Sequence, residues 1–493
     1  MKRRYAIAFL AGAATVLAFA PAGIYPLALV TFAGLIELWM RATPRRAALL
    51  GLAFGLGLFG AGVSWVYVSL HRFGGMPGPI AAVATLGFCA LIALFPAGAG
   101  WLQARLPASP VVRACLVIPA SWTLFEWLRS WVLTGFPWLS VGYAAVGWPT
   151  QWLAPITGVF GLSFVTLALA GLLWTALRAR RRWLPVLGIA AVLAGSQALA
   201  LVAWSVPHGP VTRVALLQGN IAQDMKFDPA RYERILETYA RLAEESRARL
   251  IVLPETALPR FHDRVAPHYF ALLEAIGRRN DGDVILGVPF RAGEGEYYNS
   301  ALSFGVSPRQ AYHKRHLVPF GEFVPPGFAW VMRLLNIPFS DFSRGAPVQA
   351  PLQVAGQRVA VNICYEDAFG DEIARQLPEA TLLVNMSNVA WFGDSLAPAQ
   401  HLQIARLRAI ETARMHLAAT NTGITAAIDR DGTVLMQLPQ FVEGRLVIDA
   451  RGYAGPTPYV RWGDWPAVVA MLALLLAVLF VAWRAGSAAL RSR

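Results

Sequence analysis

Charged residues are scarce in this sequence. Only 15% of the 493 residues are charged, whereas 56% are hydrophobic, and the mean hydropathy is +0.47. A soluble protein of this length needs many more charged side chains to cover its surface. The scarcity of charge therefore argues against a soluble enzyme and predicts a protein with several membrane spans.

Cysteine is also scarce, and metal-binding motifs are missing. Cys89 and Cys115 lie in apolar sequence and are interpreted as packing residues, while Cys364 is the only cysteine of the polar region. A lone thiol in such a region is a candidate nucleophile. Neither a CxxC nor an HExxH spacing occurs, so no metal or other cofactor is predicted.

Acidic residues are nearly missing from the apolar flanks. Between residues 206 and 462, lysine and arginine balance aspartate and glutamate, so the flanks supply the whole net charge of +14. Basic residues in short loops between apolar runs indicate membrane orientation and not a nucleic-acid surface.

The apolar flanks predict eight transmembrane helices. Their limits are 5–20, 24–40, 47–70, 79–103, 111–133, 156–177, 183–204 and 466–483. The first resembles a signal peptide but is interpreted as a retained span, because a second follows almost at once. Glu37, Glu126 and Arg129 lie inside predicted spans and are interpreted as structural charges, the last two as a possible pair on one helical face.

The basic clusters fix the predicted orientation. If the spans alternate, these clusters share one side: residues 2–4, 41–46, 105–113, 178–182 and 484–493. The opposite short loops hold only Arg72 as a clear basic residue. The positive-inside rule then places both termini in the cytoplasm and the polar region outside, which for a bacterial chain is the periplasm. The predicted domains are 1–205, 206–464 and 465–493.

The polar region alternates strand and helix patterns, which predicts an α/β domain. Expected strands are 213–217, 250–253, 284–287, 301–304, 359–363, 381–385, 417–420 and 424–429. Expected helices are 229–247, 265–279, 368–376 and 399–414.

Three polar side chains that suit acyl transfer follow predicted strands. They are Glu255 in LPET, Lys314 in YHKRH and Cys364 in NICYED. A thiolate can attack a carbonyl, a carboxylate can take and return its proton, and an ammonium can stabilise the oxyanion. A single such residue indicates only a solvated strand end, but the three together favour a catalytic site.

These motifs resemble the nitrilase, or carbon–nitrogen hydrolase, superfamily, and with the flanking spans they resemble its membrane-bound apolipoprotein N-acyltransferase family. Further matching motifs are GFPWLSVGY, QGNIAQDMKF, YYNSA, NMSNVAWFG, QHLQIARLRAIETAR and ATNTGITAAID. The resemblance implies an αββα sandwich beside about eight transmembrane helices. Two positions depart from the family pattern and receive no role: Phe227, often Trp, and Val389, often Asp.

The resemblance also implies residue roles. Glu255 would be the general base, Lys314 the oxyanion stabiliser and Cys364 the nucleophile. Supporting roles are implied for Glu322, which would hold the lysine; Tyr365 and Glu366, which would shape the cleft; and Asn299, Trp391 and Phe392, which would line the site or its lid. For the two aromatic residues, plain core packing is the alternative.

The implied activity is a two-step acyl transfer. The sn-1 acyl chain of a phospholipid, typically phosphatidylethanolamine, would pass through a cysteine thioester to the α-amine of a diacylglyceryl-cysteine on an apolipoprotein. The apolar segment 323–342 is hypothesised to be an arm that gates lipid entry, with an ordinary core helix as the alternative. Two rival functions remain open: a membrane-tethered amidase of small substrates, and a transporter or receptor that lacks catalysis.

Overall fold

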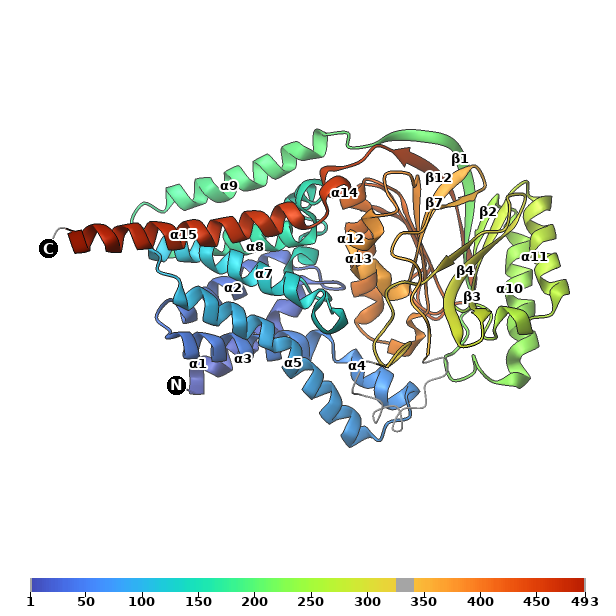
Figure 1. Cartoon of the computed structure of the whole chain (residues 1–493), viewed down its shortest axis with the longest axis horizontal. Coiled ribbons are helices and arrows are strands. Elements are labelled where there is room, and N and C mark those ends of the chain that lie inside the picture. The colour runs from blue at the N-terminus through green and yellow to red at the C-terminus, as the bar shows by residue number, and fades with distance from the viewer. Residues whose placement is uncertain (1, 325–340, 492–493) are drawn as a thin grey trace. The chain divides into compact units, whose positions relative to one another are not determined.

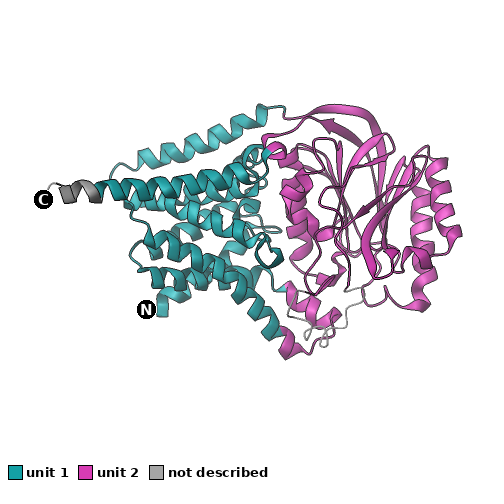
Figure 2. Cartoon of the chain, viewed as in Figure 1, with its two compact units in different colours: residues 1–64, 82–203, 462–493 teal, residues 65–81, 204–461 magenta. Residues whose placement is uncertain are grey.

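The structure is a computed structural model that describes residues 2–324 and 341–491. The chain divides into two compact units (Figure 2). Unit 1 holds residues 1–64, 82–203 and 462–493, and unit 2 holds residues 65–81 and 204–461. The arm predicted at 323–342 lies almost entirely outside the described residues.

Unit 1 is helical. Its main helices are α1 (Lys2–Thr15), α2 (Tyr25–Met40), α3 (Pro44–Gly62), α5 (Gly78–Arg105), α7 (Ile118–Arg129), α8 (Ala154–Arg178), α9 (Trp183–Ala198) and α15 (Trp465–Arg491). In the described part of the chain, five helices are long and apolar enough to cross a membrane, or six if α3 and Trp65–Phe73 form one bent span. Helices α1 and α2 have 14 and 16 residues, below the roughly 20 that cross a bilayer without help. The count of eight spans stays a prediction.

The ionisable residues predicted inside the spans have polar partners. Glu126 accepts hydrogen bonds from Trp122 Nε1 and the Val141 backbone N–H, both 2.9 Å long, and Arg129 donates to the Trp138 carbonyl over 2.7 Å. These contacts tie the loop after α7 back onto that helix. Charged groups in apolar surroundings need such partners, which agrees with the structural interpretation.

Unit 2 contains two six-stranded sheets. The first has the order β12-β1-β2-β3-β4-β5 and the second β11-β10-β9-β8-β7-β6. The strands are β1 (Val206–Gln218), β2 (Leu250–Val252), β3 (Asp283–Gly293), β4 (Glu296–Gly305), β5 (Ala311–His313), β6 (Leu352–Val354), β7 (Gln357–Ile363), β8 (Leu382–Ser387), β9 (His416–Thr420), β10 (Ala426–Ile428), β11 (Val434–Gln437) and β12 (Gly444–Ala454). The eight predicted strands are present, and β5, β6, β11 and β12 were not predicted.

Each sheet has three parallel strands at its centre. Strands β1, β2 and β3 run parallel in the first sheet, and β7, β8 and β9 run parallel in the second. Their carboxyl ends therefore lie along one edge of each sheet, which is where an open α/β sheet places its functional groups. Glu255 follows β2, Cys364 follows β7 and Asn388 follows β8.

Apolar side chains from both sheets form one buried core. Leu216 and Val252 of the first sheet share it with Val361, Val384 and Leu417 of the second. The outer face of the first sheet packs on α10 (Tyr232–Ser246) and α11 (Pro267–Arg279), and that of the second on α12 (Gly370–Ala374) and α13 (Ala397–Thr412) (Figure 1). Because both faces of the parallel strands are buried, these strands read as continuous apolar runs in the sequence.

Candidate active site

Glu255 is buried just after β2 and is held by three hydrogen bonds. Asn299 Nδ2 and Lys314 Nζ donate to its Oε1 over 2.8 and 3.2 Å, and the Asn388 backbone N–H donates to its Oε2 over 2.8 Å. Burial raises the pKa of the Glu255 carboxyl, but the charges of Lys314 and Lys226 and the Asn299 hydrogen bond lower it, with a net fall. Glu255 is therefore an oriented carboxylate, the form that a general base requires.

Lys314 comes directly after the short strand β5 and is only 1% exposed. Its Nζ lies 3.2 Å from Glu255 Oε1 and 2.9 Å from Glu322 Oε1. Burial lowers the pKa of Lys314, but the charges of the two glutamates raise it, with a net rise. The residue is thus a permanent ammonium, suited to stabilising a developing oxyanion.

Asn299, on β4, links the two carboxylates beside Lys314. Its Nδ2 donates to Oε1 of both Glu255 and Glu322, each over 2.8 Å. The other oxygen of Glu322 accepts from the Val318 backbone N–H over 2.8 Å. The structure therefore places Asn299, which the sequence assigns to the lining of the site, between the two acids. Such a connected network fixes each member through its neighbours.

Cys364 sits at the end of β7 with a φ of 56°, in the left-handed region that residues other than glycine rarely adopt. Its carbonyl accepts from Asn385 Nδ2 over 3.2 Å, and its side chain is partly exposed. Backbone conformations of this kind persist only where surrounding contacts hold them. This conformation changes the direction of the chain after β7, and a 3-10 turn, Cys364–Ala368, begins there.

The thiol of Cys364 interacts electrostatically with the three charged residues of the network. Burial raises its pKa most, the Glu255 and Glu322 charges raise it further, and the Lys314 charge lowers it, with a net rise. The resting nucleophile is therefore a thiol, whose proton must leave during attack. The structure brings Glu255, Lys314, Glu322 and Cys364 together, and their catalytic roles remain predictions.

Glu366 connects the turn after Cys364 to the segment that carries the lysine. Its Oε1 accepts from the backbone N–H groups of Arg315 and His316 over 2.7 and 3.0 Å, and its Oε2 accepts from the Ile363 N–H over 2.7 Å. The Tyr312 hydroxyl, on β5, donates to both oxygens over 3.0 Å. Glu366 therefore joins the ends of β5 and β7, which belong to different sheets.

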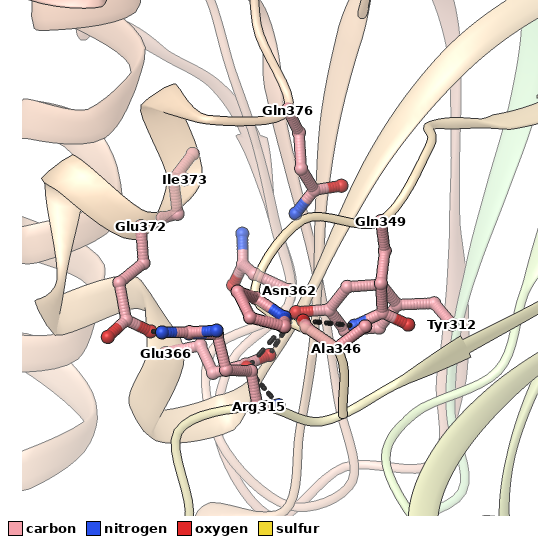
Figure 3. A pocket seen from close by; sticks show the side chains of 10 residues that line it. Tyr312, Arg315, Ala346, Gln349, Asn362, Glu366, Glu372, Ile373 and Gln376 are labelled. Carbon is pink, nitrogen blue, oxygen red and sulfur yellow. Dashed lines mark hydrogen bonds and ion pairs between the residues drawn. The ribbon is translucent and has the colours of Figure 1, made fainter. Parts of the chain in front are cut away.

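A small pocket of about 20 Å³, partly open to solvent, adjoins Glu366 (Figure 3). Tyr312 and Arg315 line it on either side of the carboxylate. Burial raises the pKa of Glu366 to about 7, although its backbone donors and Lys314 lower it. Tyr365, predicted to shape the cleft, packs edge-on against Phe369 with ring centroids 5.1 Å apart.

Trp391 and Phe392 lie in a 3-10 turn, Val389–Phe392, that contacts the segment 65–81 of unit 2. The Phe392 ring lies 4.5 Å from that of Trp65, and the Trp391 ring lies 6.2 Å from that of Phe73. Both aromatic residues remain partly exposed. Their role in lining the site stays a prediction.

Three further residues belong to this site, although the sequence analysis did not single them out: Lys226, Asn388 and Gly287. Gly287, on β3, lies against the turn that carries Glu255. Lys226 Nζ donates to the backbone carbonyl of Glu255 over 3.3 Å, and Asn388 donates to its carboxylate over 2.8 Å. Lys226 and Asn388 stand inside family motifs, QGNIAQDMKF and NMSNVAWFG, which is the only local signal that marks them.

Two family models match the chain: "Apolipoprotein N-acyltransferase N-terminal domain" over residues 11–172 and "Carbon-nitrogen hydrolase" over residues 213–459. Proteins named apolipoprotein N-acyltransferase are similar to it. The one from Nitrosomonas europaea is 48% identical, covering 96% of this chain and 96% of that protein. The one from Methylococcus capsulatus is 46% identical, covering 92% and 91%. A carbon-nitrogen hydrolase structure from Helicobacter pylori G27 is 18% identical over 52% of this chain and 95% of that one, with a TM-score of 0.38.

The carbon–nitrogen hydrolase model spans nearly all the residues that build the two sheets, so unit 2 carries a nitrilase-like fold, as the sequence predicts. The chain belongs to the apolipoprotein N-acyltransferase family.

Gly287→Ala is expected to slow acylation of the enzyme by about 10- to 100-fold, because small displacements of a catalytic group are costly. A Cβ at Gly287 would lie 2.8 Å from the Glu255 Cα, too close for any real contact, so the Glu255 turn must move. The measurement is the single-turnover rate of acyl-enzyme formation. Gly293→Ala, on the same strand β3, is the matched control, because a Cβ there meets nothing within 4 Å. Equal rates in the two variants would contradict the placement of Glu255 as base.

Proposed function

We propose that this chain moves the sn-1 acyl chain of a phospholipid, with phosphatidylethanolamine as the expected donor, to the α-amine of an N-terminal diacylglyceryl-cysteine. The activity itself follows from membership of the apolipoprotein N-acyltransferase family. The observation that carries the assignment to residues is the buried network of Glu255, Asn299, Lys314 and Glu322 beside Cys364.

In the first half-reaction, Cys364 attacks the ester carbonyl while Glu255 takes the thiol proton. Lys314 and a backbone N–H beside the cysteine stabilise the oxyanion. The carbon–oxygen bond then breaks, and Glu255 returns the proton to the departing lysophospholipid oxygen. The enzyme is left as a thioester.

In the second half-reaction, the neutral α-amine attacks the thioester carbonyl. The carbon–sulfur bond breaks, and Cys364 regains a proton as the amide forms. Because water competes with the amine, the site has to exclude it. Trp391 and Phe392 are the aromatic side chains proposed to shield the thioester.

The proposed location is the bacterial inner membrane, with residues 206–464 in the periplasm and both termini in the cytoplasm. The basic residues of the flanking loops support this orientation. The proposed domains remain 1–205, 206–464 and 465–493, with eight spans and an αββα sandwich.

Incubation with phospholipid vesicles alone is expected to leave a fatty acyl group on Cys364 and to release one lysophospholipid for each enzyme. The amine acceptor is absent, so the thioester accumulates. Intact-protein mass spectrometry measures the adduct, and its loss with hydroxylamine identifies a thioester. Vesicles of ether-linked phospholipid, which offer no ester carbonyl, are the control.

The main rival is a membrane-tethered amidase that acts on small soluble amides through the same residues. Turnover of such amides together with no acyl adduct from vesicles would favour that rival and refute the lipid donor. An adduct from ester vesicles, with none from ether vesicles, would exclude it.

A further inference from the structure

Lysine is very rare in this chain. Of the 43 lysine and arginine residues only three are lysines, namely Lys2, Lys226 and Lys314. Lys2 stands at the N-terminus, and the other two are 2% and 1% exposed in unit 2. Because 40 of the 43 basic residues are arginines, the two buried lysines stand out against a strong preference for arginine. Lys314 has its role in the network, and Lys226 has none assigned.

Lys226 faces the catalytic centre from the loop after β1. Its Nζ donates one hydrogen bond, to the Glu255 carbonyl over 3.3 Å, and the remaining N–H groups have no protein partner among the residues that the structure describes. The loop is fixed by Asn388 Nδ2, which donates to Gln223 Oε1 over 2.9 Å. Since Asn388 also donates to the Glu255 carboxylate, the same residue orders both Lys226's loop and the proposed base.

The two buried lysines differ in their charge environment. Lys314 touches two carboxylates, whereas Lys226 forms no ion pair within 4 Å among the described residues. Burial lowers the pKa of Lys226 to about 8, although the charges of Glu255, at the end of β2, and Cys364, at the end of β7, raise it. These are the two titratable groups that act on Lys226. At neutral pH a fraction of about one tenth of such an amine is uncharged.

The second half-reaction needs a group that accepts a proton from the ammonium, and Glu255 is a poor acceptor for that proton. An α-ammonium has an ordinary pKa of about 8, and it must lose a proton before its nitrogen can attack. The carboxyl of Glu255 has a pKa below its usual range, because Lys314, Asn299 and Lys226 stabilise its anion. Proton transfer from the ammonium to that carboxylate is therefore strongly uphill, whereas transfer to a lysine amine of similar basicity is nearly balanced.

We propose that Lys226 accepts the proton of the incoming α-ammonium, so that Glu255 serves the thiol and Lys226 serves the amine. This inference rests on the proposed acyl transfer. The neutral Lys226 takes the first proton, and the amine forms its bond to the thioester carbon. Glu255 takes the second proton from nitrogen and passes it to the departing sulfur, while Lys226 returns its proton to water. An arginine at this position stays charged at any working pH and could not act in this way.

The test separates the two half-reactions in the purified full-length protein. Acyl-enzyme is first formed on vesicles, and a synthetic peptide with an N-terminal diacylglyceryl-cysteine is then added. Lys226→Met and Lys226→Arg are each converted fully to acyl-enzyme before the peptide is added, so that any change in acylation through Glu255 does not enter the transfer rate. Both should transfer the acyl group to the peptide about tenfold more slowly at pH 7, a modest general-base effect because part of the amine is already neutral.

The pH profile and a second acceptor exclude a merely structural effect. Wild-type transfer should rise as pH increases through about 8, as Lys226 loses its proton, and the variants should lose that part of the rise. Hydroxylamine, which is already neutral at pH 7, should accept the acyl group equally fast from variant and wild type.

Unchanged peptide transfer in Lys226→Met would overturn the inference, and so would equal slowing with both acceptors. Failure of the wild-type protein to form any acyl-enzyme would instead refute the proposed function. The two failures are therefore distinguishable.

Discussion

Cys364→Ala is expected to abolish both half-reactions, with no acyl-enzyme and no lysophospholipid release above the uncatalysed rate. No other described side chain can replace the sulfur, because Cys89 and Cys115 lie in unit 1 and Cys364 is the cysteine on which Glu255 and Lys314 act. The loss should exceed about 10⁴-fold, since removing a nucleophile removes the covalent route itself.

Mass spectrometry of the variant after incubation with phospholipid vesicles checks this prediction. Cys115→Ala is the matched control, because it removes a partly buried thiol from unit 1 and should leave the adduct intact. Cys364→Ser tests the chemistry more finely, since a hydroxyl is a weaker nucleophile than a thiol at the same place. A hydroxylamine-sensitive adduct on Cys364→Ala would show that another residue carries the acyl chain.

The strands that carry the site could be predicted because they are central and parallel. Such strands are buried on both faces, so β2 reads Leu-Ile-Val, β8 begins Leu-Leu-Val, and β7 ends in a mostly apolar stretch, Val-Ala-Val-Asn-Ile. Each run is followed by a polar residue at its carboxyl end, which is how Glu255 and Cys364 could be found. The short edge strands β5 and β6 have three residues each and no comparable pattern. The sequence analysis placed Lys314 after a strand, but none of the predicted strand ranges corresponds to β5.

Contacts between distant segments could not be predicted. Asn388 is 133 positions from Glu255, and Tyr312 is 54 positions from Glu366, yet both pairs are hydrogen-bonded. Local sequence gives no sign of such pairing, because an asparagine after a strand resembles any solvated loop residue. The left-handed backbone of Cys364 is equally hidden, since cysteine has no preference for that conformation. Long-range packing decides these features.

Glu366→Ala is expected to slow acylation by about 100- to 1,000-fold, even though Glu366 is not proposed to touch the substrate. The carboxylate accepts the backbone N–H groups of Arg315 and His316, which directly follow Lys314, and that of Ile363, which directly precedes Cys364. Without it, three backbone N–H groups and the Tyr312 hydroxyl lose their acceptor. The Lys314 ammonium and the Cys364 thiol are then no longer held in a fixed position relative to each other.

The Glu366 prediction is checked by single-turnover acylation together with the thermal midpoint of the purified protein. Glu372→Ala is the matched control, because Glu372 lines the same pocket but pairs with His316 and Arg315 through a more exposed carboxylate. The Glu372 carboxylate pairs with the Arg315 and His316 side chains and does not hold the backbone beside Cys364, so this control should lose less than about threefold in rate. Glu366→Gln should not restore activity, since its amide would place donors against the N–H groups that need an acceptor. If Glu366→Ala and Glu372→Ala acylate equally fast, the link between the two sheets does not position the catalytic groups.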